Sequence, residues 1–443
     1  MSRLVALWMA ALISSGCHRD AKPDPIQAQA STEPSIEIRS APEPSKPARA
    51  GVSRPATPAE RAAIDELVQA AESVRQLRLR RPVTLEIEDG EAIAQSLRAQ
   101  IDVDELERAR LVYGALGLLD AESDLHSMFA GVLGEQVIGY YDPETGRLVV
   151  RDSVMAGLAG SFGPDEAAEA RAVLVHELVH ALQDQRLGLG AEYEKERTAD
   201  ADNAFRAVVE GDATLAMLGH ALRQQGIPLS AATQGIQQMG SYLELDSLVQ
   251  GEKLDDAPAI VRVTLVAPYL RGLQFIAAVQ GRGGWPAVNN AHRRPPATSE
   301  QVLHPDKYFG REPGEAVAVV DHPALLAAGF ERVAEDTLGE LELSVYFGQR
   351  EPTGTDDVAA AGWAGDHLVV YLRDGRPAVV WWTTWDSNED ADQAYRAARS
   401  VSPRDSTARV ERKGRSVLII RGLPPKLHRA AQSVFNEFAR RIK

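Results

Sequence analysis

The feature that most constrains this chain is the pentapeptide HELVH, which runs from His176 to His180. It lies in the middle of a predicted helix from about Asp165 to Leu187. Residues four apart project from one helix face about 6 Å apart, so both imidazoles can bind one metal ion. Glu177 lies roughly 100° around the helix and can hold a water molecule beside that ion. The fold must therefore keep this helix intact and bring further ligands to it.

The cysteine count narrows the kind of metal site. Among 443 residues there are 10 histidines and only one cysteine, Cys17. This excludes a disulfide framework and any cysteine-based zinc site, so the ligands must be His, Asp or Glu. The HExxH pattern is typical of zinc hydrolases, in which the glutamate takes a proton from water and passes it to the leaving amine. We therefore expect one Zn²⁺ per chain, held by His176 and His180, with Glu177 as general base. The alternatives are a zinc site that is structural or inactive, and two histidines that bind no metal.

A catalytic zinc needs a third protein ligand and one open position. Glu210 lies within an otherwise apolar predicted helix, at about Glu196 to Arg223, where an unpaired carboxylate would be costly. The neighbouring Gly211 would let this helix approach a partner closely. The other downstream acidic residues lie in a hydrophilic connection where water can solvate them: Glu192, Glu194, Glu196, Asp200 and Asp202. We expect Glu210 to be the third ligand. The alternative is an ion pair between Glu210 and Arg206.

With these residues in place, the chain resembles the gluzincin group of zinc metallopeptidases, over about residues 135–225. That group combines HExxH on one helix with a glutamate ligand on a following helix, and the EGDA segment around Glu210 is similar to the ligand segment of its aminopeptidase branch. The separation between His180 and Glu210 is longer here. The resemblance implies His176, His180 and Glu210 as ligands and Glu177 as base. It also implies a substrate-binding sheet edge upstream, at Val137–Tyr141 or Arg147–Arg151. The segments HALQDQ, EGDA, PPATSEQVLHPDKY, GWAGD and WDS further resemble a family of prokaryotic surface lipoproteins, which implies no substrate.

Other polar residues are candidates for supporting roles. Metal-bound imidazoles usually donate their second N–H to a carboxylate or carbonyl. Asp184 lies four residues after His180, and the next helix offers Asp200, Asp202 and Asn203. Donors for a developing oxyanion are often Tyr, His or Arg, and the candidates are Tyr269, His304 and Tyr308. Each of these residues could equally be an ordinary surface polar group or a buried tyrosine with a backbone partner.

The N-terminus predicts export. Residues 1–17 contain Arg3, an apolar run and small residues ending at Cys17, a signal segment too short to span a membrane. The ending resembles the lipobox of bacterial lipoproteins, in which the cysteine is lipidated, although Ser14 stands where leucine is usual. Residues 18–57 are rich in Pro and Ala and predict a disordered tether. We expect an exported protein of the cell envelope, lipid-anchored at Cys17 to a bacterial membrane. An ordinary cleaved signal is the alternative.

The remaining chain predicts an α+β fold, with a mainly helical zincin-like metallopeptidase domain at 58–335 and an accessory α+β domain at 336–443. The first is expected to contain helices at 58–79, 89–100, 104–119 and 258–279, a hairpin at 134–152 and a loop at 281–296. The second is expected to contain strands at 340–347, 368–372, 378–385 and 417–421, and helices at 356–362, 388–399 and 426–442. Trp381 and Trp385 would share one face of a strand and Trp382 the other. Core packing explains them, with an aromatic ligand surface as the alternative.

The net charge of −15 opposes a nucleic-acid surface, which needs clustered positive charge. The sequence therefore predicts an exported zinc metallopeptidase that acts on peptide or protein substrates. One alternative is a catalytically silent zinc-binding envelope adaptor whose C-terminal domain recognises a partner. Another is a zinc hydrolase that acts on a non-peptide amide.

Overall fold

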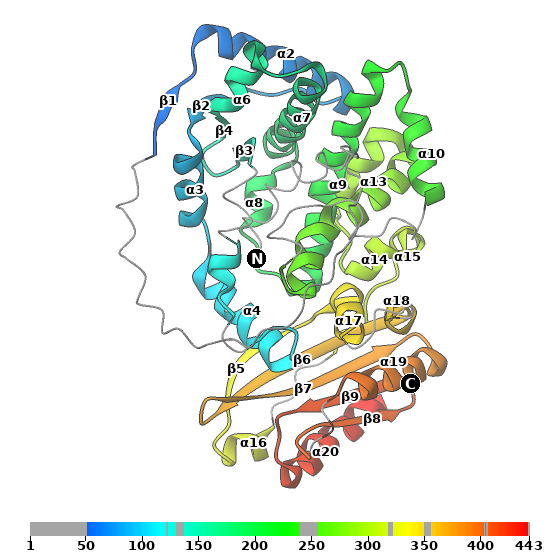
Figure 1. Cartoon of the computed structure of the whole chain (residues 1–443). Helices are drawn as coiled ribbons and strands as arrows, with labels where there is room; N and C mark the ends of the chain where they lie inside the picture. The colour runs from blue at the N-terminus through cyan, green and yellow to red at the C-terminus, as the bar shows by residue number, and fades with distance from the viewer. Residues whose placement is uncertain are drawn as a thin grey trace, which may run out of the picture.

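A computed structural model describes residues 51–441, except 121–122, 130–136, 240–255, 318–321, 350–355, 403 and 405. Cys17, the predicted signal segment and most of the predicted tether lie outside the described residues. The fold is α+β, with many helices and two small sheets (Figure 1). The helices are α2 (Pro58–Arg75), α3 (Gly90–Ala99), α4 (Val103–Leu116), α6 (Asp152–Ala156), α7 (Pro164–Leu187), α8 (Leu189–Tyr193), α9 (Ala199–Gln224), α10 (Leu229–Met239), α13 (Ala259–Arg293), α14 (Ser299–Leu303), α15 (Pro305–Gly310), α16 (Pro323–Ala327), α17 (Gly339–Phe347), α18 (Asp356–Ala360), α19 (Asn388–Val401) and α20 (Pro425–Arg441), with a π-helical turn at Gly157–Ser161.

The first sheet has the order β1-β2-β4-β3. Its strands are β1 (Ser53–Pro55), β2 (Thr84–Glu88), β3 (Gly139–Asp142) and β4 (Arg147–Arg151). The predicted hairpin is confirmed as β3 and β4, which pair antiparallel, while β2 and β4 pair parallel. β1 occupies residues that the sequence assigned to the tether. Pro55 is tolerated there because β1 is an edge strand, where a missing N–H breaks no second ladder.

Helices α7, α9 and α13 form the centre of the first part of the molecule (Figure 1). α9 and α13 cross at two glycines: a Cβ added to Gly211 would lie 2.2 Å from the carbonyl carbon of Gly272, and one added to Gly272 would lie 2.3 Å from the carbonyl oxygen of Ala207. Only glycine permits such close contact of two backbones.

Among the described helices, α13 alone is long and apolar enough to cross a membrane, but 67% of its apolar window is buried in the fold. It therefore has the character of a core helix.

The second sheet has the order β5-β6-β7-β9-β8 and is antiparallel throughout. Its strands are β5 (Glu331–Asp336), β6 (Trp363–Arg373), β7 (Arg376–Trp385), β8 (Arg409–Lys413) and β9 (Ser416–Arg421). The expected tryptophan pattern is confirmed, since Trp381 and Trp385 pack in one core cluster and Trp382 in another on the opposite face. All three side chains are at most 1% exposed, so they form core and not a ligand surface.

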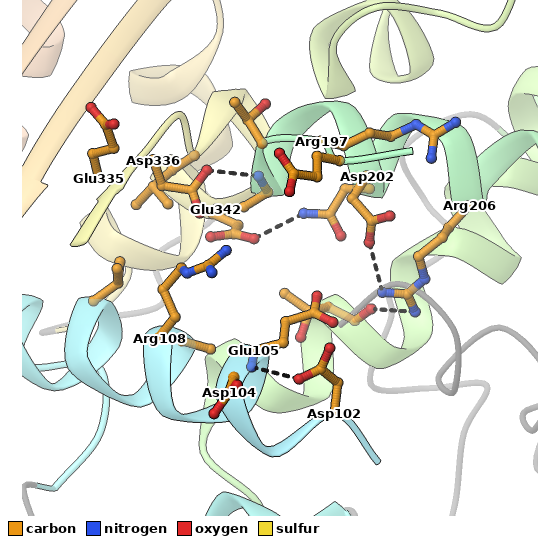
Figure 2. Close-up of a pocket in the computed structure, with 18 of the residues that line it drawn as sticks. Asp102, Asp104, Glu105, Arg108, Arg197, Asp202, Arg206, Glu335, Asp336 and Glu342 are labelled. Atoms are coloured by element: carbon orange, nitrogen blue, oxygen red, sulfur yellow. Dashed lines mark hydrogen bonds and ion pairs between the residues drawn. The ribbon is translucent and has the colours of Figure 1, made fainter. Parts of the chain in front are cut away.

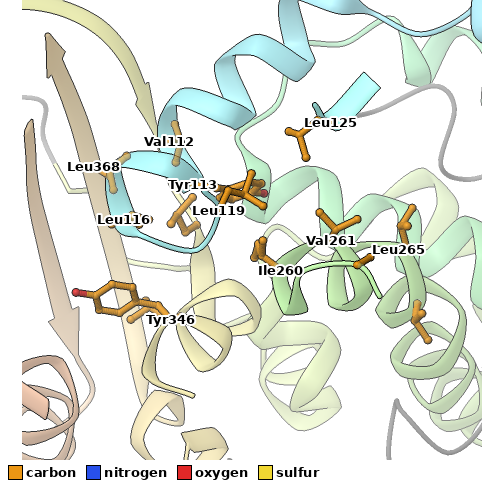
Figure 3. Packing of buried hydrophobic residues seen from close by; sticks show 14 of the residues in the cluster. Val112, Tyr113, Leu116, Leu119, Leu125, Ile260, Val261, Leu265, Tyr346 and Leu368 are labelled. Atoms are coloured by element: carbon orange, nitrogen blue, oxygen red, sulfur yellow. The ribbon is translucent and has the colours of Figure 1, made fainter. Parts of the chain in front are cut away.

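The largest hydrophobic cluster joins the two parts of the molecule. Figure 3 shows Tyr113 and Leu116 of α4, Ile260 of α13, Tyr346 of α17 and Leu368 of β6 packed around one volume. The predicted division between residues 335 and 336 lies inside β5, which pairs with β6.

Two predictions about local structure are wrong. Residues 340–347 were expected to form a strand, but they form α17. Asp366 of β6 explains the difference: its carboxylate accepts hydrogen bonds from the N–H groups of Leu338 and Gly339 and so caps the helix start from a distant segment.

The loop expected at 281–296 is helical as far as Arg293, after an interruption at Gly283 and Gly284. Its glycines mark a kink between two helical segments.

Candidate metal centre

The three predicted ligands come together from two helices. His176 and His180 lie on successive turns of α7, and Glu210 lies on α9 and faces both. α7 begins with Pro164 at its first position and ends at Gly188 in the left-handed conformation, so the motif occupies the regular middle of a long helix. The packing of α9 onto α7 then brings the Glu210 carboxylate to the imidazoles.

The spacing of the donor atoms fits a tetrahedral ion. Nε2 of His176 lies 3.2 Å from Oε2 of Glu210 and 3.0 Å from Nε2 of His180, and the third distance, from His180 Nε2 to Glu210 Oε2, is 3.6 Å. Zinc ligands at about 2.0–2.1 Å in a tetrahedron are separated by about 3.3 Å. In the part of the chain that the structure describes, Oε1 of Glu210 and Nδ1 of His176 have no hydrogen-bond partner. Three donor atoms thus converge on one point that a cation would fill.

The site is buried, and this sets its electrostatics. His176, Glu177, His180 and Glu210 are all at most 1% exposed. Burial opposes ionisation of Glu210, but the two imidazoles outweigh it and hold the pKa of Glu210 below its usual value. Burial alone would lower the pKa of His180, yet the charge of Glu210 raises it to about 9. A metal ion that binds here would therefore have to displace a proton from His180.

Glu177 is held against the edge of the first sheet. Its Oε2 accepts a hydrogen bond of 3.0 Å from the backbone N–H of Tyr141 in β3. Burial raises the pKa of Glu177 to about 8. Of the two segments that the resemblance offered as a sheet edge, only the first contains an edge strand, β3, because β4 lies between β2 and β3. The strand beside the base is therefore Gly139–Asp142.

His180 is positioned by a polar chain that the sequence reasoning missed. Its Nδ1 contacts Oε1 of Gln183 at 2.9 Å, and Nε2 of Gln183 donates to Oδ2 of Asp212 at 3.0 Å. Asp212 in turn accepts from Nε of Arg75 at 2.6 Å and pairs with His292 at 2.8 Å. Burial alone would raise the pKa of Asp212, but Arg75 and His292 hold it far below its usual range. One signal was available, because Asp212 lies in the same apolar helix as Glu210.

The residues predicted to support the ligands lie elsewhere. Asp184 accepts from the Tyr141 hydroxyl at 2.7 Å and from the Gly190 N–H. Asp200 accepts from the Ser299 N–H, and Asn203 donates to Glu342. Asp202 lies 4.0 Å from Arg206, so the alternative partner proposed for Glu210 interacts with a different carboxylate.

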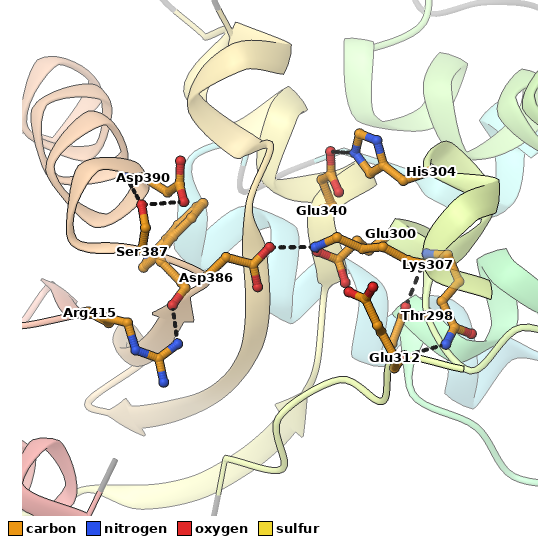
Figure 4. Close-up of polar contacts among 12 residues, drawn as sticks. Thr298, Glu300, His304, Lys307, Glu312, Glu340, Asp386, Ser387, Asp390 and Arg415 are labelled. Atoms are coloured by element: carbon orange, nitrogen blue, oxygen red, sulfur yellow. Dashed lines mark hydrogen bonds and ion pairs between the residues drawn. The ribbon is translucent and has the colours of Figure 1, made fainter. Parts of the chain in front are cut away.

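The three candidate oxyanion donors are separated by the fold. The ring of Tyr269 stacks on that of His176, with centroids 6.0 Å apart. Tyr308 donates its hydroxyl to the Arg294 carbonyl. His304 pairs with Glu340 at 2.8 Å, close to Lys307 (Figure 4). Of the three, Tyr269 is the residue that the structure brings to the metal ligands.

The family model that matches this chain lies outside the candidate metal centre. A family model described as a domain of unknown function (DUF8575) matches residues 325–431, which cover the second sheet and exclude all three ligands. No curated protein and no solved structure matches the chain.

Proposed function

We propose that the protein is an exported zinc-dependent metallopeptidase of gluzincin type. His176, His180 and Glu210 would hold the zinc, and Glu177 would act as general base. The observation that carries the proposal is the convergence of three buried donor atoms, 3.0–3.6 Å apart, beside the carboxylate of Glu177. We also propose the lipid anchor at Cys17, which rests on the sequence alone.

The donor set supports catalysis more than a purely structural role. Structural zinc sites usually have four protein ligands, whereas catalytic sites have three and leave one position open. Among the described residues, the cluster contains three His, Cys, Asp or Glu side chains. A bound zinc would supply Lewis-acid polarisation of a substrate carbonyl and would acidify a water molecule.

The residues of the chain supply the proton transfers. Glu177 lies next to the first ligand on α7, and its carboxylate is fixed by the Tyr141 N–H. It can therefore accept a proton from the attacking water and deliver it to the leaving nitrogen. The chain from Gln183 to Asp212 fixes the ring of His180, which keeps the donor atoms preorganised.

A second candidate function is a silent zinc site within an envelope binding protein. It is favoured by the complete burial of the three ligands and the base, because a substrate must reach the open position. A zinc hydrolase of a non-peptide amide would use the same residues and would differ in the shape of its pocket.

The experiment compares wild type with Glu177→Gln and His180→Ala, using metal analysis and a broad peptide library. The proposal expects zinc in wild type and in Glu177→Gln, cleavage by wild type only, and loss of zinc from His180→Ala. Zinc without cleavage of any peptide would favour the silent site. A folded wild type that binds no zinc would contradict both.

A further inference from the structure

A cleft of about 870 Å³ opens between α4, α9 and α17 (Figure 2). Its volume lies in the range of ligand pockets, about 300–1,000 Å³. α9 forms one wall, where Asp202, Arg206 and Glu210 follow one another at intervals of four residues and so share one helix face. Each interval is about 6 Å along the axis, which places the metal ligand about 6–12 Å beyond the lining residues of the cleft.

The lining of the cleft is strongly acidic. Nine carboxylates stand against four basic side chains, Arg108, Lys195, Arg197 and Arg206. Three of these cations are already engaged. Lys195 and Arg197 both pair with Glu192, which lies outside the lining, and Arg206 lies 4.0 Å from Oδ2 of Asp202.

Two buried acceptor atoms in the cleft lack hydrogen-bond partners among the described residues. Oε1 of Glu342 accepts hydrogen bonds from Asn203 and Tyr113, but Oε2 has no partner in the described part of the chain, and Glu342 is 1% exposed. Oδ1 of Asp202 likewise has no hydrogen-bond partner among the residues that the structure describes, and Asp202 is 8% exposed. Figure 2 shows both carboxylates directed toward the space between α4 and α9. Leaving such acceptors unsatisfied is unfavourable, and a donor from a ligand would remove that penalty.

Burial raises the pKa of Glu342 to about 8, and the charge of Asp336 adds to this effect. A cation bound beside Glu342 would offset this cost of ionising its carboxylate. Tyr193 also lines the cleft, and its buried hydroxyl has no hydrogen-bond partner among the described residues. Burial raises the pKa of Tyr193, and the charge of Glu210 adds to this effect. Tyr193 is therefore within electrostatic reach of the metal ligand.

We propose that the cleft binds the lysine or arginine side chain of a peptide, through Glu342 and Asp202, and directs the neighbouring peptide bonds toward Glu210. The binding step stands on the cleft itself, while cleavage of the bound peptide rests on the proposed function. An extended peptide advances about 3.3 Å per residue. The distance of about 6–12 Å along α9 therefore places the basic residue about two to four positions from the cleaved bond.

The test uses the full chain with Glu177→Gln, so that peptides bind without being consumed. Fluorescence anisotropy compares a labelled peptide containing two arginines with the same peptide containing glutamines. We expect the arginine peptide to bind at least tenfold more tightly. The double variant Glu342→Gln, Asp202→Asn should abolish that preference, whereas Asp374→Asn, which removes an exposed carboxylate outside the cleft lining, should leave it unchanged.

A rim variant keeps the test valid if the double variant does not fold. Asp104→Asn with Glu196→Gln alters two exposed cleft residues and should weaken the preference less, in the same direction. Equal binding of the two peptides, or a preference that both cleft variants retain, would overturn the proposal. Spermine that binds through Glu342 when the arginine peptide does not would overturn the assignment to peptides.

Cleavage assays with wild type separate this inference from the proposed function. Equal cleavage of the arginine and glutamine peptides would leave the peptidase standing and overturn the cleft assignment. An arginine peptide that binds through Glu342 and Asp202 but is never cleaved would support the cleft assignment and contradict the peptidase.

Discussion

Glu210 is a buried carboxylate that faces two imidazoles, and its partners indicate what the site can bind. A carboxylate with no exposed surface must meet a cation or hydrogen-bond donors. In the described part of the chain, Arg206 contacts Asp202 and the Thr264 carbonyl. Glu210 therefore has the two imidazoles as its partners, and the three groups together could hold a metal ion.

The first prediction concerns Gln183. Replacing it with leucine removes the acceptor for His180 Nδ1 and the donor to Asp212. Loss of such supporting partners typically weakens metal binding about 10- to 100-fold, and we expect a loss of that size for Gln183→Leu. Zinc affinity, measured by competition with a chelator, checks it.

The control is Arg186→Ala, which alters an exposed residue on the same helix and should leave zinc affinity unchanged. Zinc affinity of Gln183→Leu equal to that of wild type would show that the polar chain does not position His180.

Sequence reasoning reached some of these residues and not others, for physical reasons. His176, Glu177 and His180 follow from helix periodicity, and Glu210 follows from the cost of burying a charge. Gln183 was missed because helix spacing allows contact at both three and four residues, and Asp184 was named as the carboxylate four residues after His180. The structure shows that Tyr141 engages Asp184 instead, a long-range contact that no local pattern encodes.

At the level of elements, the crossing of α9 and α13 holds the third ligand in place. Gly272→Ala would bring a methyl group against the Ala207 carbonyl, which cannot move without shifting α9. We expect destabilisation of about 1–3 kcal/mol, together with weaker zinc binding because Glu210 moves with its helix. Chemical denaturation and zinc titration of the same variant measure the two effects.

Gly114→Ala serves as the matched substitution. Gly114 lies in α4, and an added Cβ there meets no atom of the described residues within 4 Å. Alanine is favoured over glycine in helices by about 0.5–1 kcal/mol, so this variant should be slightly more stable. Equal stability of the Gly272→Ala and Gly114→Ala variants would refute the close crossing.

Helix α17 yields a prediction about pH. The folded chain raises the pKa of Glu342 from its usual value of 4.5 to about 8, so the folded state binds this proton more tightly than the unfolded chain does. The contribution of Glu342 to stability is therefore full below pH 4.5 and is lost as pH rises toward about 8. Glutamine does not ionise.

Glu342→Gln should accordingly gain stability over wild type between pH 5 and 8, on the order of a few kcal/mol. Urea denaturation at several pH values, with chelator present, measures this difference. Asp374→Asn, which removes a carboxylate that is 88% exposed, serves as the comparison variant. A constant difference between Glu342→Gln and wild type across that range would contradict the account.

On the scale of the whole molecule, the two parts share one core and ion pairs. The cluster around Tyr113 and Leu368 spans both parts, and Lys307 bridges Glu300 and Asp386 at 2.5 Å each (Figure 4). Helix positions and the hairpin could be predicted from local patterns. The shared core could not, because α17 takes its cap from Asp366 and its neighbours from distant segments.

We therefore expect the full chain to unfold in a single thermal transition. A chain that ends at residue 317 should lack a cooperative transition and should bind a hydrophobic dye, because half of the shared cluster is removed. Two separate transitions in calorimetry, or a truncated chain that keeps its zinc, would show that the parts fold independently.

The most direct test of the central claim is the zinc content of the purified chain, measured by mass spectrometry together with zinc absorption spectroscopy. We predict one zinc per chain, bound by two imidazole nitrogens and one carboxylate, with zinc lost from His180→Ala and bound much more weakly by Glu210→Gln. A folded wild type without metal, or zinc retained at full affinity in both variants, would contradict the claim.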